Sequence, residues 1–407
     1  MKCRFCSNPL THVFADLNDS PPSNSYLKKE QLTKPEARYP LKVWTCEKCY
    51  LTQLDEFKSH EEIFSEEYAY FSSFSTSWVA HAKDYVEKMT KEFGLNQNSM
   101  VVEVASNDGY LLQHVKALGI PCLGVEPTKS TAEAARKIGI NTVEVFFGKQ
   151  SATKLKEQGY SADLTAANNV LAHVPDINDF VGGFKILLKE NGVSTFEFPH
   201  LLQLVANNQF DTIYHEHFSY LSLISVKQIM EKVGLRVFHV EEIPTHGGSL
   251  RVYVTHDNAS HKTRPSVAEV LNKEKLTGMD KINFYKGFQN NIEKVCADFM
   301  EFLNKAKKDG KKVAAYGAAA KGNTLMNYCN IDSSLISFVC DLSPHKQNLY
   351  MPGSKIPIMH PDEIKKQKPD YVVILPWNLK AEISTQLAYI RKWNAKFVVA
   401  IPKLEIF

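Results

Sequence analysis

Apolar and polar positions alternate through the middle of the chain in blocks that predict strands and helices in turn. "SMVVEVASNDGYLLQHVKALGI" predicts a short buried strand, a polar loop at "ASNDG" and a helix with Leu111, Leu112, Val115 and Leu118 on one face. "PCLGVEP" predicts a second strand, and "TVEVFF", "ADLTAANNVLAHV" and "GVSTFEFP" predict three more. This alternation is typical of a doubly wound, mostly parallel α/β sheet whose ligands bind at the carboxyl ends of the strands.

The same pattern predicts how the rest of the chain is organised. The helix "SVKQIMEKVG" and the strands "LRVFHVEEI" and "SLRVYVT" complete the first sheet. A long helical segment after residue 257 leads into a second alternation of strands and helices, from "KKVAAYGAAAKGNTLMNYC" to "YVVILPWN". Ahead of the first sheet, "YAYFSSFS" is aromatic and rich in hydroxyl groups, which suits a segment that covers a site. We expect three domains, at residues 1–68, 69–257 and 258–407.

Composition adds limits to this picture. A length of 407 residues exceeds what one ordinary core supports, which agrees with several domains. The chain is 44% hydrophobic and 23% charged, and its net charge of +3 gives no reason to expect nucleic acid or an anionic membrane as a partner. The start lacks the apolar core of a secretory signal, and there is no apolar run of about 18 residues to span a bilayer. We expect a cytoplasmic protein, either a monomer or a small homo-oligomer.

Cysteine spacing predicts a metal site near the start of the chain. "CRFC" and "CEKC" place two thiolates each on a tight turn, and two such turns close a tetrahedral site around Zn²⁺. The four ligands are Cys3, Cys6, Cys46 and Cys49. Because four thiolates leave no open position for water, this zinc is expected to be structural. The remaining cysteines stand singly in apolar surroundings and are expected to be reduced, buried thiols: Cys122, Cys296, Cys329 and Cys340.

The loop after the first strand indicates an adenosine cofactor without phosphates. Glu126, at the tip of the second strand, is placed to accept hydrogen bonds from ribose hydroxyls. NAD and FAD need a glycine-rich turn for their pyrophosphate, whereas this loop has only Gly109 and carries Asp108. S-adenosylmethionine, with an ammonium and a sulfonium, suits the loop better, although an ordinary turn without a ligand has similar composition. The predicted cofactor residues are Glu103, Ala105, Ser106, Asn107, Asp108, Gly109, Glu126, Pro127, Asn168 and Asn169.

The stretch "FDTIYHEHFSY" packs Tyr214, His215, Glu216 and His217 into four consecutive positions beyond the "FEFP" strand. Histidines in a catalytic zinc motif usually stand one helical turn apart and have a third ligand, which no nearby residue supplies. Histidines that merely satisfy hydrogen bonds in the core or on the surface are a second interpretation. The position above the carboxyl edge of the sheet favours general acid and base chemistry.

Six motifs in one order give the chain a family resemblance. "CRFC…CEKC", "EVASNDGYLL", "GVEP", "YHEHFSY", "HGGSLRVY" and "YGAAAKGNTLMNY" together resemble the three-domain sugar C-methyltransferases that act on nucleotide-linked deoxysugars. The resemblance implies a zinc-binding N-terminal domain, a central class I methyltransferase sheet and a C-terminal Rossmann-like domain that helps to hold the nucleotide sugar. It also implies that His217 is the base, supported by Tyr214, Glu216, His173 and one tyrosine of "EEYAYFSS", either Tyr68 or Tyr70.

The reaction expected from this resemblance is methyl transfer to a carbon, C-3, next to the ketone of a 4-keto-6-deoxysugar linked to dTDP or GDP. A sugar carbon becomes a nucleophile when the ketone delocalises its carbanion as an enolate, and a neutral imidazole can accept the proton. His173, a tyrosine or the "HGGS" loop can stabilise the enolate oxygen. Lys321, in "YGAAAKGN", suits a phosphate. The predicted substrate-binding residues are His246, Ser249, Arg251, Tyr316, Lys321 and Asn323.

Two other functions remain open at this point. The C-terminal Rossmann-like unit is compatible with an NAD-dependent nucleotide-sugar oxidoreductase or epimerase, although Gly317 and Gly322 do not have the dinucleotide-binding spacing. A non-catalytic zinc-knuckle binding module with a degenerate methyltransferase domain is the other alternative.

Overall fold

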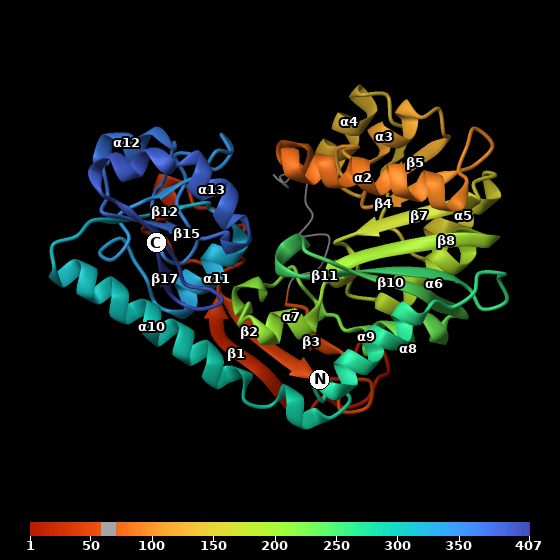
Figure 1. The fold of residues 1–407 in the computed structure, drawn as a ribbon, viewed down its shortest axis with the longest axis horizontal. Helices are drawn as coiled ribbons and strands as arrows, with labels where there is room; N and C mark the ends of the chain where they lie inside the picture. The colour runs from red at the N-terminus through yellow and green to blue at the C-terminus, as the bar shows by residue number, and fades with distance from the viewer. Residues whose placement is uncertain (58–70) are drawn as a thin grey trace.

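Three β-sheets, covered by helices, make up the molecule (Figure 1). The computed structural model describes residues 1–57 and 71–407. The unit at the right of Figure 1 and the blue unit at the left are the two larger bodies, and the N-terminal strands and helix α10 run beneath them. Within the described residues, no helix combines the length and the apolar character needed to cross a membrane.

The N-terminal sheet has four antiparallel strands in the order β1-β2-β3-β9. Three of its strands come from the start of the chain, but the fourth, β9, follows the Tyr-His-Glu-His stretch far along the sequence. Thr52 pairs with Tyr220 and Gln53 with Ser219. The bounds are β1 His12–Ser20, β2 Tyr39–Thr45, β3 Thr52–Leu54 and β9 Ser219–Tyr220.

The central sheet has seven strands in the order β10-β11-β8-β7-β4-β5-β6. Five neighbouring strands, β8 to β6 in that order, are parallel, and β11 and β10 add two antiparallel strands at one edge. The predicted doubly wound, mostly parallel sheet is therefore confirmed. The bounds are β4 Val101–Val104, β5 Cys122–Val125, β6 Thr142–Val143, β7 Ala162–Asn168, β8 Leu188–Pro199, β10 Leu235–Ile243 and β11 Ser249–His256.

Helices cover both faces of this sheet, because its strands bury apolar side chains on both sides. One face packs against α2 and α3, and the other against α6 and α8. Two details differ from the predictions: Leu118 is 51% exposed, and the strand expected at "TVEVFF" ends at Val143. The helices are α2 Thr76–Phe93, α3 Leu112–Ala117, α4 Lys129–Lys137, α5 Lys149–Glu157, α6 Ile177–Leu187, α7 Leu201–Ala206 and α8 Leu223–Lys232.

The C-terminal unit is a second doubly wound sheet, in the order β14-β13-β12-β15-β16-β17, with only β17 antiparallel. Its strands are β12 Val313–Tyr316, β13 Val339–Cys340, β14 Ile358–Met359, β15 Tyr371–Ile374, β16 Lys396–Val399 and β17 Glu405–Ile406. Its helices, with the preceding connector α9, are α9 Pro265–Leu276, α10 Phe288–Lys308, α11 Ala320–Tyr328, α12 Asp362–Gln367 and α13 Lys380–Gln386.

The N-terminal sheet and the C-terminal unit share one hydrophobic core. Phe14 of β1 stacks on Phe288 of α10 with ring centroids 4.8 Å apart, and strand residues of both sheets belong to the same cluster. The domain boundary expected at residue 68 lies outside the described residues, and the one at 257 remains a prediction.

A disulfide joins Cys296 of α10 to Cys329 after α11, with Cα atoms 5.6 Å apart. The expectation of four separate reduced thiols is therefore wrong for this pair, whereas Cys122 and Cys340 are free. The two bonded residues are far apart in sequence, and they meet because both helices contribute to one hydrophobic cluster.

Candidate active site

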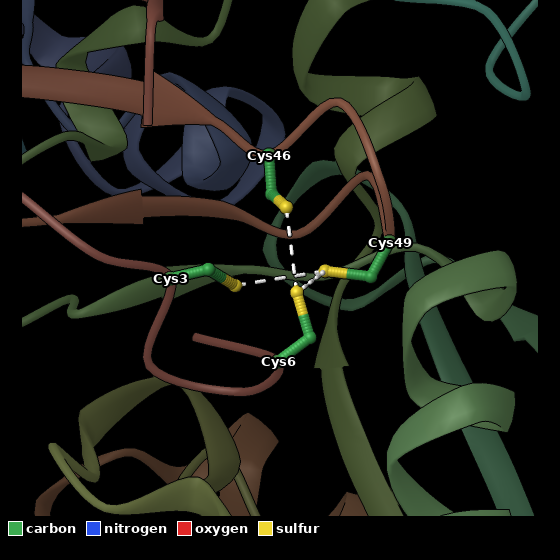
Figure 2. A group of neighbouring side chains, drawn as sticks. All are labelled: Cys3, Cys6, Cys46 and Cys49. Atoms are coloured by element: carbon green, nitrogen blue, oxygen red, sulfur yellow. Dashed lines mark hydrogen bonds between the residues drawn. The ribbon is translucent and has the colours of Figure 1, made fainter. Parts of the chain in front are cut away.

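The four cysteines of the N-terminal sheet converge on one point (Figure 2). Their sulfur atoms lie within 4.8 Å of one another, and three of the sulfur pairs are 3.6 Å apart. In a tetrahedral site with Zn–S bonds of about 2.3 Å the sulfurs are about 3.8 Å apart, so this arrangement fits zinc. Gln53 donates from Nε2 to Cys3 Sγ at 3.2 Å, a contact that orients one ligand. With four protein ligands, zinc holds the fold and has no position for a substrate.

A cleft of about 1760 Å³ lies where the three parts of the molecule meet. Its walls include Asn24 and Tyr26 from the N-terminal part, Asn107 and Glu126 from the central sheet, and Lys346 from the C-terminal unit. Pockets for one drug-sized ligand occupy roughly 300–1,000 Å³, so this space can take a cofactor and a second molecule together.

The loop after β4 forms one side of the cleft. Ala105, Asn107 and Gly109 adopt left-handed backbone conformations, with φ of 57°, 50° and 82°. A side chain at Gly109 would also press on Ile138, whose Cδ1 lies 3.1 Å from the position of an added Cβ. Non-glycine residues in this conformation are strained, and such strain is common where a loop is shaped for a ligand.

Glu126 holds this loop from the end of β5. Its Oε2 accepts a hydrogen bond from the backbone N–H of Asn107, and its Oε1 accepts one from Thr128, both at 2.9 Å. Burial raises the pKa of Glu126 above its ordinary value, and the N–H groups of Thr128 and Asn107 oppose this. Ser72 and Ser73 pack against the loop after β4. The backbone N–H of Ser72 donates to Asn107 Oδ1, and that of Ser73 donates to Asp108 Oδ2. The end of the predicted covering segment is therefore in contact with the cofactor loop.

The predicted cofactor residues fall into two groups. Those that line the cleft are Ala105, Asn107, Glu126, Pro127, Asn168 and Asn169, whereas Glu103, Ser106, Asp108 and Gly109 lie beneath or beside it. Asn168 is 9% exposed, and neither polar atom of its side chain has a partner among the described residues. A buried amide of this kind fits a ligand that both donates and accepts hydrogen bonds, as S-adenosylmethionine does.

The Tyr-His-Glu-His stretch reaches the cleft from the short helix η4 (Phe210–Thr212). The ring of His217 lies 4.0 Å from that of Tyr214 and 4.6 Å from that of His173, measured between centroids. Strand β9 holds the far end of the stretch against the zinc-bearing sheet, where the N–H of Leu54 donates to the carbonyl of Phe218 at 3.0 Å. The three side chains are thus brought together by the fold.

The tautomer of His217 follows from its hydrogen bond. Nδ1 lies 2.8 Å from the carbonyl oxygen of Thr212, and because a carbonyl only accepts, Nδ1 carries the proton. In the neutral ring, Nε2 is then the proton acceptor. Burial, followed by the neighbouring His173, lowers the pKa of His217 well below its ordinary value, and burial lowers that of His173 to about 4. The imidazole is therefore neutral and ready to accept a proton at neutral pH.

Glu216, which the family resemblance implies as a supporting residue, makes its side-chain hydrogen bond away from the His217 imidazole. Its Oε1 accepts a hydrogen bond from Asn24 Nδ2 at 2.6 Å, and its backbone contacts His173. Burial raises the pKa of Glu216 to about 6, against the effects of Asn24 and Lys346. Glu216 thus links the loop that carries His217 to the N-terminal part, and the carbonyl of Thr212 orients His217. Tyr68 and Tyr70 lie outside the described residues.

Two of the six predicted substrate-binding residues, His246 and Lys321, line the cleft. Arg251 instead forms ion pairs with Glu197 at 2.6 Å and Glu241 at 3.1 Å beneath α2. Asn323 donates to the carbonyl of Ser23 at 2.6 Å. Ser249 and Tyr316 are also outside the lining.

Sequence reasoning did not single out several cleft residues. Trp78, in the first turn of α2, stacks on His81 at 4.9 Å and lies 5.4 Å from His246, between ring centroids. Tyr26 and Lys346 both donate to the carbonyl of Ala318, at 2.6 and 2.9 Å. Their role depends on contacts between distant segments. The one sequence signal that could have pointed to these contacts is the polar, proline-rich composition of the N-terminal stretch, which is poorly suited to forming a core of its own.

Comparison with known proteins covers the whole chain. Family models match residues 3–64 as a zinc binding domain, 78–240 as a methyltransferase domain and 244–402 as a C-methyltransferase C-terminal domain. The C-methyltransferase NovU of Streptomyces niveus is 33% identical over 405 residues, which span 100% of this chain and 96% of that protein. The chain belongs to the S-adenosylmethionine-dependent C-methyltransferase family.

Solved methyltransferases resemble part of this C-methyltransferase. The magnesium protoporphyrin IX methyltransferase of Synechocystis, with bound S-adenosylhomocysteine, is 13% identical with a TM-score of 0.34 and covers 44% of this chain and 83% of its own. A methyltransferase from Anabaena variabilis is 13% identical with a TM-score of 0.36, covering 43% and 84%.

Family membership confirms the predicted fold class, the S-adenosylmethionine cofactor and the structural zinc. It favours carbon methylation over the NAD-dependent and non-catalytic alternatives.

Proposed function

We propose that this C-methyltransferase methylates C-3 of a 4-keto-6-deoxysugar linked to dTDP or GDP, with His217 as the base. The observation that carries the proposal is the neutral His217 ring, whose Nδ1–H is fixed by Thr212 and whose Nε2 is left to accept a proton at the cleft. A neutral base of this kind suits a carbon acid next to a ketone, which loses its proton to form an enolate.

The cleft supports a nucleotide-linked substrate. Its volume leaves room for a second ligand beside the cofactor, and Lys28, Lys34 and Lys346 line the walls away from the central sheet. Ammonium groups at these positions suit a diphosphate, since they are mobile, compact charges. The ring-lined floor formed by His173, Tyr214 and His217 would then receive the sugar.

Bound S-adenosylmethionine would supply an electrophilic methyl group, and the electron pair of the broken C–S bond would remain on the sulfur of the departing S-adenosylhomocysteine. Glu126 and Asn168 are placed to hold its polar groups, and the loop at residues 105–109 shapes that side of the cleft. Ser72 lies against this loop and Trp78 lines the same cleft, so we expect both to limit access of water to the reacting carbon.

Proton exchange in D₂O tests the proposal. The protein is mixed with 4-keto-6-deoxy sugars linked to dTDP or GDP, with and without S-adenosylmethionine, and deuterium and methyl incorporation are followed by mass spectrometry. We expect deuterium at C-3 without cofactor and a methyl group there with it. Methylation of a different carbon would correct the position, and neither change on any sugar nucleotide would refute the proposal.

A further inference from the structure

Lys321 belongs to the C-terminal unit, and its charge acts on His217. It lies in the first turn of α11 and lines the cleft. Among residues 1–57 and 71–407, its ammonium makes one hydrogen bond, to Asn378 Oδ1 at 2.9 Å, and it stands 4.7 Å over the ring of Trp377. An ammonium has three donors, so the bond to Asn378 leaves it with capacity to bind a ligand.

Helix α11 is fastened directly to the segment that orients His217. Thr324 donates from Oγ1 to the carbonyl of Ile213 at 2.8 Å, and that residue follows Thr212, the partner of the base. Lys321 precedes Thr324 by three residues, so both side chains are on the same face of the helix. Trp377 also donates from Nε1 to Asp211 Oδ2 at 2.8 Å. The ammonium therefore faces the loop that carries the base.

Charges around the loop agree with this placement. Burial raises the pKa of Asp211 to about 6, and Lys321 is the first influence that opposes the rise. The charge of Lys321 also lowers the pKa of His217 and of His246, in addition to the larger effect of burial on each. Lys321 is thus a half-buried cation near two histidine rings that are neutral, with Asp211 as the nearby carboxylate.

We propose that the ammonium of Lys321 donates a hydrogen bond to the ketone oxygen of the substrate and stabilises the enolate. This inference rests on the proposed function. The C–H bond beside the ketone breaks: its proton moves to Nε2 of His217, its electron pair forms the C=C bond of the enolate, and the π pair of the C=O bond moves onto the oxygen. Negative charge develops there, beside Lys321 and the positive end of α11. Lys321 then acts at the reacting centre, and the diphosphate role predicted for it passes to the other lysines of the cleft.

Replacement of Lys321 by Met removes the charge and keeps the length of the side chain. For K321M we expect kcat to fall on the order of 10²–10³-fold, as when one donor to an oxyanion is lost, with the KM for the sugar nucleotide changed less than about threefold. Deuterium exchange at the substrate carbon should fall in parallel, and K321R should recover part of it. Lys346→Met is the matched variant, expected mainly to raise KM. A raised KM with unchanged kcat in K321M would instead assign Lys321 to the phosphates and overturn the proposal.

A measurement without substrate tests the placement of Lys321 separately from the proposed methylation of a keto sugar. Titration of ¹⁵N-labelled histidine by NMR, with His217→Asn to assign the resonance, should give a higher pKa for His217 in K321M than in the wild type, because a nearby positive charge is lost. An unchanged His217 titration would overturn the placement of Lys321 beside the base, with thermal unfolding as the check that the variant is folded. Failure of the proposed function would be visible already in the wild-type enzyme, as absence of exchange on every keto sugar, and would overturn both.

Discussion

The central and C-terminal units use the same local design at the end of their second strands. In the central unit, Glu126 after β5 accepts a hydrogen bond from the N–H of Asn107 in the loop after β4, at 2.9 Å. In the C-terminal unit, Asp341 after β13 accepts one from the N–H of Ala318 in the loop after β12, at 2.7 Å. Both acids line the same cleft, so the two sheets present corresponding edges to it.

What lies on each edge differs. The central loop has left-handed Ala105 and Asn107 and faces the cofactor space. In the C-terminal unit, Tyr26 and Lys346 both donate hydrogen bonds to the carbonyl of Ala318. Because Tyr26 comes from the N-terminal part of the chain, that part is attached to the loop after β12. On the proposed function, one topology serves as a cofactor cradle in one unit and as a support for the reacting centre in the other. The shared fold does not decide the function of each unit. The contacts made at the ends of its strands do.

Removal of zinc should have the largest effect on turnover. The N-terminal part that zinc stabilises is attached through Tyr26 to the loop after β12 of the C-terminal unit, whereas the cofactor loop belongs to the central unit. Structural zinc contributes on the order of 10 kcal/mol to folding of small domains. We expect a chelator to unfold the N-terminal sheet and reduce methyl transfer below about 1% of its initial value, because Asn24 and β9 no longer hold the base loop. Affinity for S-adenosylmethionine should change less than about threefold, as the cradle lies in the central unit.

Zinc content, calorimetric unfolding and turnover before and after zinc is restored provide the measurements. Cys122→Ser is the control, because Cys122 is a free thiol outside the cluster. Full turnover of zinc-free protein would show that the N-terminal sheet does not position the base.

His217→Asn tests the base itself. Loss of a general base lowers rates by about 10²–10⁴-fold, and we expect a loss in this range with little change in cofactor affinity. His215, in the same loop and in contact with the carbonyl of Tyr39, gives the matched variant His215→Asn, which should retain turnover within about tenfold. Single-turnover kinetics and calorimetric cofactor binding distinguish these results. Equal losses in both variants would contradict the assignment of His217.

The pH dependence of the reaction gives a further check on His217. Because its pKa lies well below the ordinary value, the ring stays unprotonated as pH falls through 6.5, the ordinary pKa of histidine. We expect turnover to persist below that pH and to fall only in more acidic solution, when other steps are not limiting. A pH–rate profile in buffers of constant ionic strength measures this. An inflection near 6.5 would show that another group, or a solvated histidine, controls the rate.

Replacement of Glu126 and of Asp341 by their amides, each in a separate variant, tests the comparison of the two units directly. Glu126→Gln leaves one of two backbone N–H groups without its charged acceptor, which we expect to weaken S-adenosylmethionine binding about 10-fold or more. Asp341→Asn should leave that affinity within about threefold, because Asp341 holds the other loop. Isothermal titration of both variants measures the difference. Equal weakening would mean that the cofactor depends on both edges.

Glu216→Gln should have the smallest effect, on stability. Burial raises the pKa of Glu216 to about 6, so the folded state favours the protonated carboxyl more than the unfolded state does. The contribution to stability is present below about pH 4.5 and is lost as pH rises through about 6. The neutral amide should therefore be more stable than wild type by about 1–2 kcal/mol at pH 8 and equal to it near pH 4.5.

Urea unfolding at the two pH values measures this difference, and the exposed Glu190→Gln serves as control. A constant difference between Glu216→Gln and wild type at both pH values would contradict burial of an ionisable carboxyl at this position.

Local sequence was sufficient for the parts of the molecule that depend on local spacing. The pairs Cys3–Cys6 and Cys46–Cys49 specify a four-cysteine site, and alternating apolar blocks specify both doubly wound sheets. The order of the strands within each sheet was not predicted, because the alternation gives the elements but not which strands become neighbours. Glu126 was placed correctly at the end of the second strand for the same reason.

Contacts between distant segments were beyond sequence reasoning. Nothing near Glu216 indicates Asn24 as its partner, and nothing near Lys321 indicates Asp211 and Trp377. Arg251 stands in a conspicuous motif, but it pairs with the buried carboxylate of Glu197 and the half-buried one of Glu241, because a buried charge must be paired. These pairings depend on how three units pack together, and single-sequence patterns describe each unit separately.

The pairing of β3 with β9 also has a consequence for folding order. The zinc-bearing sheet is started by residues near the beginning of the chain but lacks its fourth strand until residues 219–220 are synthesised. Chains emerge from the ribosome N-terminus first, and contacts of such long range form late because closing the loop is slow. His217, two residues before this strand, is thus positioned only after the five parallel strands of the central sheet have been synthesised. A chain that ends before β9 holds the four cysteines and the loop after β4 but no positioned His217.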